Sequence, residues 1–234
     1  MQRLYLTLLL AMALSVAAGA AFAGDIVTVP TANQVKAGEM DVADYYIAVD
    51  DEALPGFLRG HGIKFVRAQT LYVGLTDQVE LDVHRYDVDK LGANTIFNST
   101  VVVQPEDLKR PIIVVGGRDL SRVYGHASYF VSAAKTLNPP VGGPPTGPIY
   151  RLHLSLGTED KTLFGEERHE GLFGGIQVLA KPTFPQVGVV ALYDGQDIIT
   201  ALTYTPTPKW PTFKGGTFGG HTWYGISYTF NAKP

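Results

Sequence analysis

Residues 69–88 read QTLYVGLTDQVELDVHRYDV and carry the clearest structural pattern of the chain. The second half of this stretch alternates strictly between apolar and polar side chains, in the order Val79, Glu80, Leu81, Asp82, Val83 and His84. Because successive side chains of a β-strand point to opposite faces, this order puts the apolar groups on one face and the acids and the imidazole on the other. Thr76-Asp77-Gln78 separates the two halves, so the whole stretch predicts a β-hairpin.

The same two-residue period recurs in residues 150–156, 172–179 and 221–230. The last of these segments places four large side chains on one face, namely Tyr224, Ile226, Tyr228 and Phe230. A closing strand with an aromatic-rich outer face is common in outer-membrane β-barrels, and we therefore expect these four residues to face lipid. In an ordinary β-sandwich, which is the alternative, the same face would point into the core.

Turn residues divide the chain after residue 24 into segments of roughly 8 to 11 residues, about the length that a tilted strand needs to cross a bilayer. Twelve strands are expected, beginning near Met40, Gly62, Gln78, Thr95, Pro111, Tyr124, Ile149, Gly171, Gln186, Asp197, Lys209 and His221. An even number suits a closed, antiparallel up-and-down β-barrel, which leaves no strand edge without hydrogen-bond partners in lipid. The eleventh segment is short and contains Pro211, so ten strands are the alternative.

The first 23 residues differ from the rest of the chain. Met1-Gln2-Arg3 forms a short positive region, residues 4–16 are apolar, and Ala21-Phe22-Ala23 fits a signal-peptide cleavage site. The apolar run is shorter than the ~20 residues that a membrane helix needs. We therefore expect export, cleavage before Gly24, and a single β-barrel domain over residues 24–234 in the cell outer membrane.

Composition and motifs argue against several classes of function. The chain has no cysteine, which excludes disulfides and thiolate chemistry, and its net charge of −3 does not favour nucleic acid. Asp194-Gly195-Gln196-Asp197 predicts a hairpin turn. The densest ionisable cluster, residues 166–170 (EERHE), is expected to be a solvated loop. Since no nucleophile elbow or zinc motif is present, we expect no enzyme, metal or cofactor.

The polar faces of the predicted strands define the interior of the expected barrel. The candidate lumen-lining residues are Asp44, Lys64, Glu80, Asp82, His84, Asn98, Arg151, His153, Gln177 and Lys181. Both signs of charge are present. In a barrel of about twelve strands these groups would either line a narrow water path or fill the interior as a salt-bridged plug, and both alternatives stay open at this point.

Three stretches resemble a known family. They are GDIVTVPTA at residues 24–32 followed by Ala37-Gly38-Glu39, YVGLTDQVE at residues 72–80, and LFGGI at residues 172–176 with LYDGQD at residues 192–197. Together they resemble YjbH-type outer-membrane β-barrel proteins, which are associated with exopolysaccharide loci. Typical members are much longer, so this chain would be a compact, single-barrel relative. The resemblance implies a barrel in the outer membrane with a connection to exopolysaccharide export.

Two classes of function follow from these patterns. The first is an outer-membrane barrel with a porin-like, transport or envelope-structural role, whose partners are outer-membrane lipid and polysaccharide or small solutes. The second is a soluble secreted binding module of lipocalin-like or β-sandwich type, whose apolar faces line a ligand cavity. The direction of the four large side chains of the last strand separates the two classes, since Tyr224, Ile226, Tyr228 and Phe230 point outwards in a membrane barrel and inwards in a soluble binder.

Overall fold

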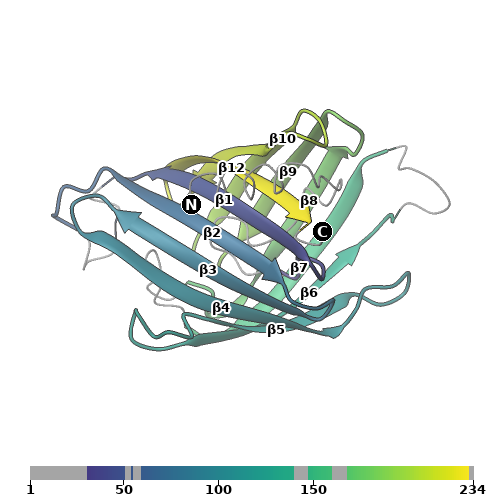
Figure 1. Cartoon of the computed structure of the whole chain (residues 1–234), viewed down its shortest axis with the longest axis horizontal. Coiled ribbons are helices and arrows are strands. Elements are labelled where there is room, and N and C mark those ends of the chain that lie inside the picture. Colours follow the sequence, from purple (N-terminus) through teal and green to yellow (C-terminus); the bar gives the residue numbers. More distant parts are fainter. Residues whose placement is uncertain (1–30, 51–53, 55–58, 140–146, 160–167, 232–234) are drawn as a thin grey trace, which may run out of the picture.

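The computed structural model describes residues 31–50, 54, 59–139, 147–159 and 168–231, and the predicted signal peptide lies outside these ranges. The described residues form one closed antiparallel β-barrel of twelve strands (Figure 1). The strands are β1 (Glu39–Ala48), β2 (Phe65–Gly74), β3 (Val79–Val88), β4 (Gly92–Gln104), β5 (Ile112–Arg118), β6 (Ser128–Thr136), β7 (Ile149–Gly157), β8 (Gly171–Lys181), β9 (Gln186–Tyr193), β10 (Ile198–Thr205), β11 (Thr212–Phe218) and β12 (His221–Asn231).

The predicted number of strands is confirmed, and the ten-strand alternative is wrong. The largest shift of a boundary is at β6, which was expected from Tyr124 and begins at Ser128. The eleventh strand begins at Thr212, directly after Pro211. The proline, which cannot donate to a ladder, therefore lies just outside the sheet instead of interrupting it.

Closure comes from the pairing of the first strand with the last. β1 and β12 pair antiparallel over their whole length, from Glu39 opposite Asn231 to Ala48 opposite Thr222. Every other strand pairs with its two neighbours in sequence. We call the end where β1 begins and β12 ends the terminus rim, and the opposite end the loop rim. All strand edges are paired, as a closed barrel requires.

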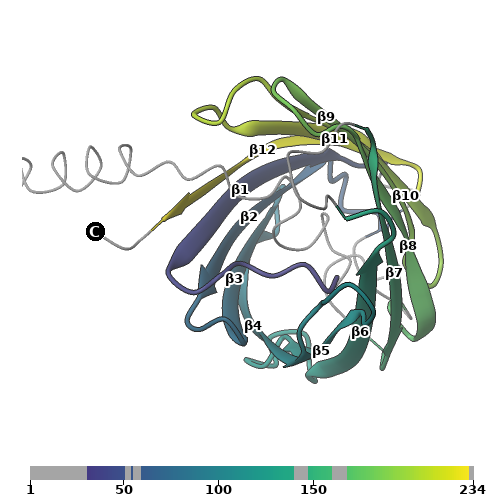
Figure 2. The ribbon, with the colours of Figure 1, turned by 90° about the vertical axis from the view of Figure 1, so that its right-hand side faces the viewer.

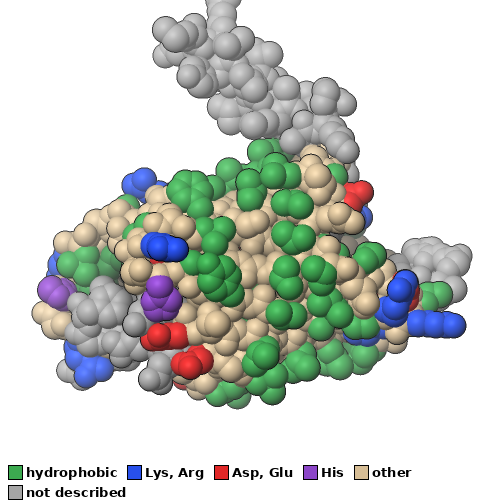
Figure 3. Space-filling model, turned by 90° about the horizontal axis from the view of Figure 1, so that it is seen from below, with side chains coloured by type: hydrophobic (Ala, Val, Ile, Leu, Met, Phe, Trp, Pro, Cys, Tyr) green, Lys and Arg blue, Asp and Glu red, His purple; other side chains and the backbone are tan. Residues whose placement is uncertain are grey.

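Side chains alternate between the outer wall and the interior. On β7, Leu152, Leu154 and Leu156 are 43%, 57% and 60% exposed, whereas His153 and Ser155 between them are buried. The same alternation holds on β3, where Leu81 is exposed and Asp82 is buried. In Figure 3 apolar side chains cover the middle of the wall, while charged side chains and histidines gather toward its two ends.

The interior toward the loop rim is filled by apolar side chains. A single cluster of buried residues draws on every strand except β7. Its large members near the loop rim are Tyr45, Ile47, Tyr86, Val88, Ile96, Phe173, Leu192, Ile199, Phe218 and Trp223, and we call this region the apolar half of the interior. Leu54 and Ile63, from the connection between β1 and β2, pack into the same cluster. Packed apolar side chains therefore occupy much of the interior in this half.

Candidate functional site: the polar half of the interior

Seven of the ten predicted lumen-lining residues face the interior, mostly toward the terminus rim, in the region that we call the polar half; His84, opposite Ile96 in the register, lies where the two halves meet. Glu80, Asp82 and His84 project inwards from β3, and Asn98 projects inwards from β4 directly opposite Asp82. The other three are Arg151 and His153 on β7 and Gln177 on β8, where Arg151 and Gln177 face each other in the register. The polar half thus has donors and acceptors on neighbouring strands at matching heights.

Three predicted residues lie elsewhere. Asp44 is on the outer wall, because β1 turns Tyr45 and Ile47 into the apolar half and an alternating strand must then turn Asp44 outwards. Lys64 is exposed and precedes the first residue of β2. Lys181 is exposed because the register between β8 and β9 shifts between Leu179 and Lys181, which ends the alternation that predicted its direction.

The chain before β1 enters the barrel. In Figure 2 this segment, coloured purple, crosses the mouth of the barrel at the terminus rim. We call residues 31–38 the N-terminal segment; Ala32 and Val35 within it are fully buried. The amide of Val35 donates to Oε2 of Glu80 at 2.5 Å, which gives a buried carboxylate a backbone partner. The segment also passes close to Gly74, where any side chain would collide with the carbonyl of Lys36.

Asn33 is the second point at which the N-terminal segment is held. Its Nδ2 donates to Oε1 of Gln177 at 3.2 Å, and its Oδ1 accepts from Nε of Arg151 at 3.1 Å. His153 Nε2 donates to the same Gln177 oxygen at 2.9 Å. One side chain of the segment is therefore bonded to both β7 and β8. This contact joins residues 144 positions apart in the chain, so no local pattern of residues could predict it.

Glu106, in the turn between β4 and β5, continues this network to the terminus rim. Its Oε2 accepts from Nη1 of Arg151 at 2.6 Å, and its Oε1 accepts from the amide of Thr136 at 2.6 Å. Burial alone would raise the pKa of Glu106, but these hydrogen bonds outweigh it and hold the pKa below its usual value. A cavity of about 960 Å³ lies beside the pair, lined by the N-terminal segment and by apolar groups such as Ile112 and Ile149.

The loop rim carries a second network, which contradicts the expectation for the EERHE cluster. Arg168 forms ion pairs with Asp194 and, at 2.7 Å, with Asp197, and its guanidinium lies 4.5 Å from the ring centre of Phe218. His169 is buried against Phe173 instead of being solvated. Residues 166 and 167 of the cluster lie outside the described residues.

The Asp194–Asp197 stretch forms the predicted turn between β9 and β10, with Oδ1 of Asp194 accepting from the amides of Gln196 and Asp197. The sequence identified this turn but not the arginine that it binds. Arg168 and Asp194 are 26 positions apart, and the pairing of β8 with β9 brings them together.

The aromatic face of β12 points away from the interior for most of its length. Tyr224 and Ile226 are exposed on the outer wall. Trp223, the residue before Tyr224 on β12, points inwards and is buried, with its ring centre 5.8 Å from that of Tyr45. Tyr228 is partly buried, and Phe230 is buried with its ring stacked on that of Tyr228. Tyr224 and Ile226 therefore point away from the interior, as predicted for the aromatic face, whereas Phe230 is buried.

The described ranges contain no group of three or more His, Cys, Asp or Glu side chains placed to hold a metal ion. They also contain no helix long and apolar enough to cross a membrane. Comparison with protein-family models and with curated proteins found no match. The function is therefore argued from the geometry of the barrel.

Proposed function

We propose that this protein is an outer-membrane β-barrel with a filled interior, and that its role in the envelope is structural instead of that of an open porin or an enzyme. The observation that carries the proposal is the direction of the apolar faces. The side chains of Leu154, Leu202 and Tyr224 are each more than half exposed on the outer wall, at 57%, 57% and 58%. In a lipocalin-like binder these faces would line a cavity.

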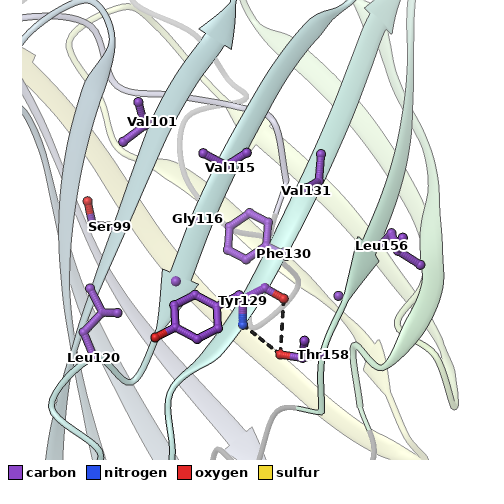
Figure 4. A pocket seen from close by; sticks show the side chains of 12 residues that line it. Ser99, Val101, Val115, Gly116, Leu120, Tyr129, Phe130, Val131, Leu156 and Thr158 are labelled. Atoms are coloured by element: carbon purple, nitrogen blue, oxygen red, sulfur yellow. Dashed lines mark hydrogen bonds between the residues drawn. The ribbon is translucent and has the colours of Figure 1, made fainter.

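The outer wall exposes apolar side chains all around the barrel, as a surface in contact with lipid would. Apolar residues are exposed on strands on every side of the barrel, including Val42 on β1, Val101 on β4 and Val189 on β9. A hollow of about 700 Å³ in this wall is lined mainly by Val101, Val115, Val131, Leu156 and other apolar groups (Figure 4). Monomeric soluble proteins rarely expose contiguous apolar patches beyond a few hundred Å². A bilayer removes this area from water.

Packing of the interior supports a closed barrel over an open pore. The apolar half is occupied by aromatic side chains such as Tyr45, Phe173 and Trp223, all of them buried. The N-terminal segment crosses the other half, bonded to Glu80 and Gln177. A general porin needs a wide polar channel along its axis, whereas here side chains pack in the apolar half and the N-terminal segment crosses the polar half beside the cavity of about 960 Å³.

The orientation that fits this proposal puts the terminus rim in the periplasm and the loop rim outside. The connections over residues 49–64 and 158–170, which are long, then face outwards. The connection between β3 and β4 at the same rim is short, because β3 ends at Val88 and β4 begins at Gly92. The connection at 137–148 is long but lies at the terminus rim. A link to exopolysaccharide rests on the family resemblance alone and stays a prediction.

The proposal is tested by fractionation and conductance together. We expect the protein in the outer-membrane fraction, with heat-modifiable migration on a denaturing gel, because a closed barrel resists the detergent until it is boiled. In planar bilayers, the refolded barrel should give no stable porin-sized conductance. Recovery in the soluble periplasmic fraction without heat-modifiable migration would overturn the membrane assignment. Steady, large conductance of the wild-type chain would overturn the filled interior.

A further inference from the structure

An ion pair lies on the outer wall of the barrel, among side chains that are otherwise largely apolar. Arg67 of β2 donates from Nε to Oδ1 of Asp44 at 2.8 Å and from Nη2 to Oδ2 at 2.5 Å, in the parallel geometry of a bidentate pair. The two side chains are 49% and 37% exposed. Both face away from the interior, because Tyr45 and Ala68 beside them point inwards.

The surroundings of this pair differ on its two sides. Toward the loop rim, the rings of Phe65, Tyr46 and Tyr224 stack across three adjacent strands at centre-to-centre distances of 5.1 and 5.2 Å. At the level of Asp44 itself, the exposed groups on the neighbouring strands are its register partner Ile226 on β12 and, beyond that, Phe213 on β11. The ion pair therefore stands at the border between the stacked rings and the level of Ile226 and Phe213.

A groove of about 540 Å³ runs along this border and joins the charged and apolar groups. Its lining includes Asp44 and Arg67 at one side and Phe213, Tyr224 and Ile226 at the other. Gly215, opposite Tyr224 in the register, adds no side chain to the wall beside the groove. A Cβ placed there would meet its nearest atoms at ordinary contact distances, 3.5 Å and 3.8 Å. Gly215 therefore leaves room for a larger side chain on the wall next to the groove.

We propose that this groove binds a phospholipid with a zwitterionic headgroup, of the phosphatidylethanolamine class. The inference rests on the proposed function, since the wall must face lipid. Arg67 keeps N–H donors beyond the two that Asp44 uses, so it can also donate to a phosphate. The Asp44 carboxylate can accept from the ammonium of the same headgroup. An acyl chain would then lie along Phe213 and Ile226. Opposite charges side by side match a zwitterion better than an anion.

Charge in a lipid-facing wall supports this assignment. Ionisable groups within a membrane are unfavourable and usually pair with each other or face a polar partner. Arg67 and Asp44 pair with each other, yet both stay substantially exposed. A bound headgroup would give their remaining donors and acceptors polar partners at the same level of the wall.

Native mass spectrometry of the detergent-refolded barrel, after incubation with phosphatidylethanolamine or phosphatidylglycerol, tests the site. We expect the wild type to retain one phosphatidylethanolamine more strongly than phosphatidylglycerol. Arg67→Gln should reduce this retention by about tenfold, the effect of losing a hydrogen bond from a charged donor. Gly215→Leu should also reduce it, by filling the groove. Arg85→Gln, on the exposed side of β3 outside the groove, is the matched control and should leave retention unchanged.

Asp44→Asn sharpens the test, because it removes the partner of the ammonium but leaves the arginine. It should shift the preference toward phosphatidylglycerol. Equal retention of both lipids by the wild type, or unchanged retention in Arg67→Gln, would overturn the proposal. Dimers that Arg67→Gln abolishes would also overturn it, since a second copy would then cover the groove. If the protein lacks heat-modifiable migration, the proposed membrane barrel itself is wrong. This outcome is distinct from loss of lipid retention, which contradicts only the lipid site.

Discussion

The two halves of the interior are closed by different physical means. In the apolar half, aromatic and aliphatic side chains such as Trp223 and Phe218 pack against each other and need no partner beyond the barrel. In the polar half, buried groups such as Glu80 and Gln177 bond to a segment that belongs to no strand. A packed region loses stability when a side chain is made smaller. A hydrogen-bonded segment is loosened when a bonding partner is removed or protonated. The apolar half should therefore carry the stability of the barrel, and the polar half should be the part that opens.

The largest effect is expected from Trp223→Ala in the apolar half. Trp223 is 1% exposed, and the substitution leaves a cavity against Tyr45. We expect the free energy of unfolding to fall by about 3 to 5 kcal/mol. Urea denaturation of the refolded barrel in detergent measures it. Trp210→Ala, at an exposed position, is the control and should change little. A loss below about 1 kcal/mol for Trp223→Ala would mean that the apolar half is not tightly packed.

The next effect is expected from Arg168→Ala at the loop rim. The side chain of Asp194 is 0% exposed and would lose its ionic partner, although two backbone amides still donate to it. We expect a loss of about 2 to 3 kcal/mol in the same denaturation assay. Arg168→Lys should recover only part of it, because an ammonium cannot bridge Asp194 and Asp197 as a planar guanidinium does. Full recovery by lysine would show that charge alone is needed.

A smaller and local effect is expected from Asn33→Ala in the polar half. The substitution removes the hydrogen bonds to Gln177 and Arg151 but leaves the strands intact. Hydrogen exchange at the amide of Val35 should speed up by about tenfold, while exchange in the strands stays unchanged. Asn138→Ala, at the terminus rim but bonded to Pro148 outside the interior, should leave Val35 as it was. Strand amides that exchange equally faster would show that the segment is part of the cooperative barrel.

The smallest effect concerns acid pH at Glu106. Its pKa is lowered from 4.5 in the folded chain, so its contribution is complete above the unfolded pKa and disappears as the pH falls through the folded pKa. Protection of the Val35 amide should therefore decline below about pH 4.5, since Glu106 holds Arg151, which holds Asn33. In Glu106→Gln this part of the pH dependence should be absent. An identical pH profile in the two proteins would show that the ionisation of Glu106 does not help to hold the N-terminal segment.

Alternation in the sequence predicted the strands and most of their faces, because period two is a local property of each strand. The alternation predicted the wrong side-chain direction where that direction depends on residues distant in the sequence. On β1, the apolar residues Tyr45 and Ile47 point into the apolar half of the interior, so Asp44 between them and Ala43 points outwards. The rule that polar residues point inwards therefore fails on this part of β1. Lys181 was misplaced by a register shift that only the pairing with β9 defines. The entry of the N-terminal segment depends on the closed barrel, and the pairing of Arg168 with Asp194 depends on the register of β8 with β9, so neither has a signature in the local sequence.

The central claim, that the apolar faces meet lipid and the polar faces meet the interior, is tested most directly on β7. The chain has no cysteine, so Leu154→Cys and Ser155→Cys each provide a single labelling site on adjacent residues. We expect a spin label at 154 in bilayers to be accessible to oxygen and shielded from a water-soluble nickel chelate, and a label at 155 to be poorly accessible to both. A label at 154 that reaches the nickel chelate, or one at 155 that is more accessible to oxygen than 154, would contradict it.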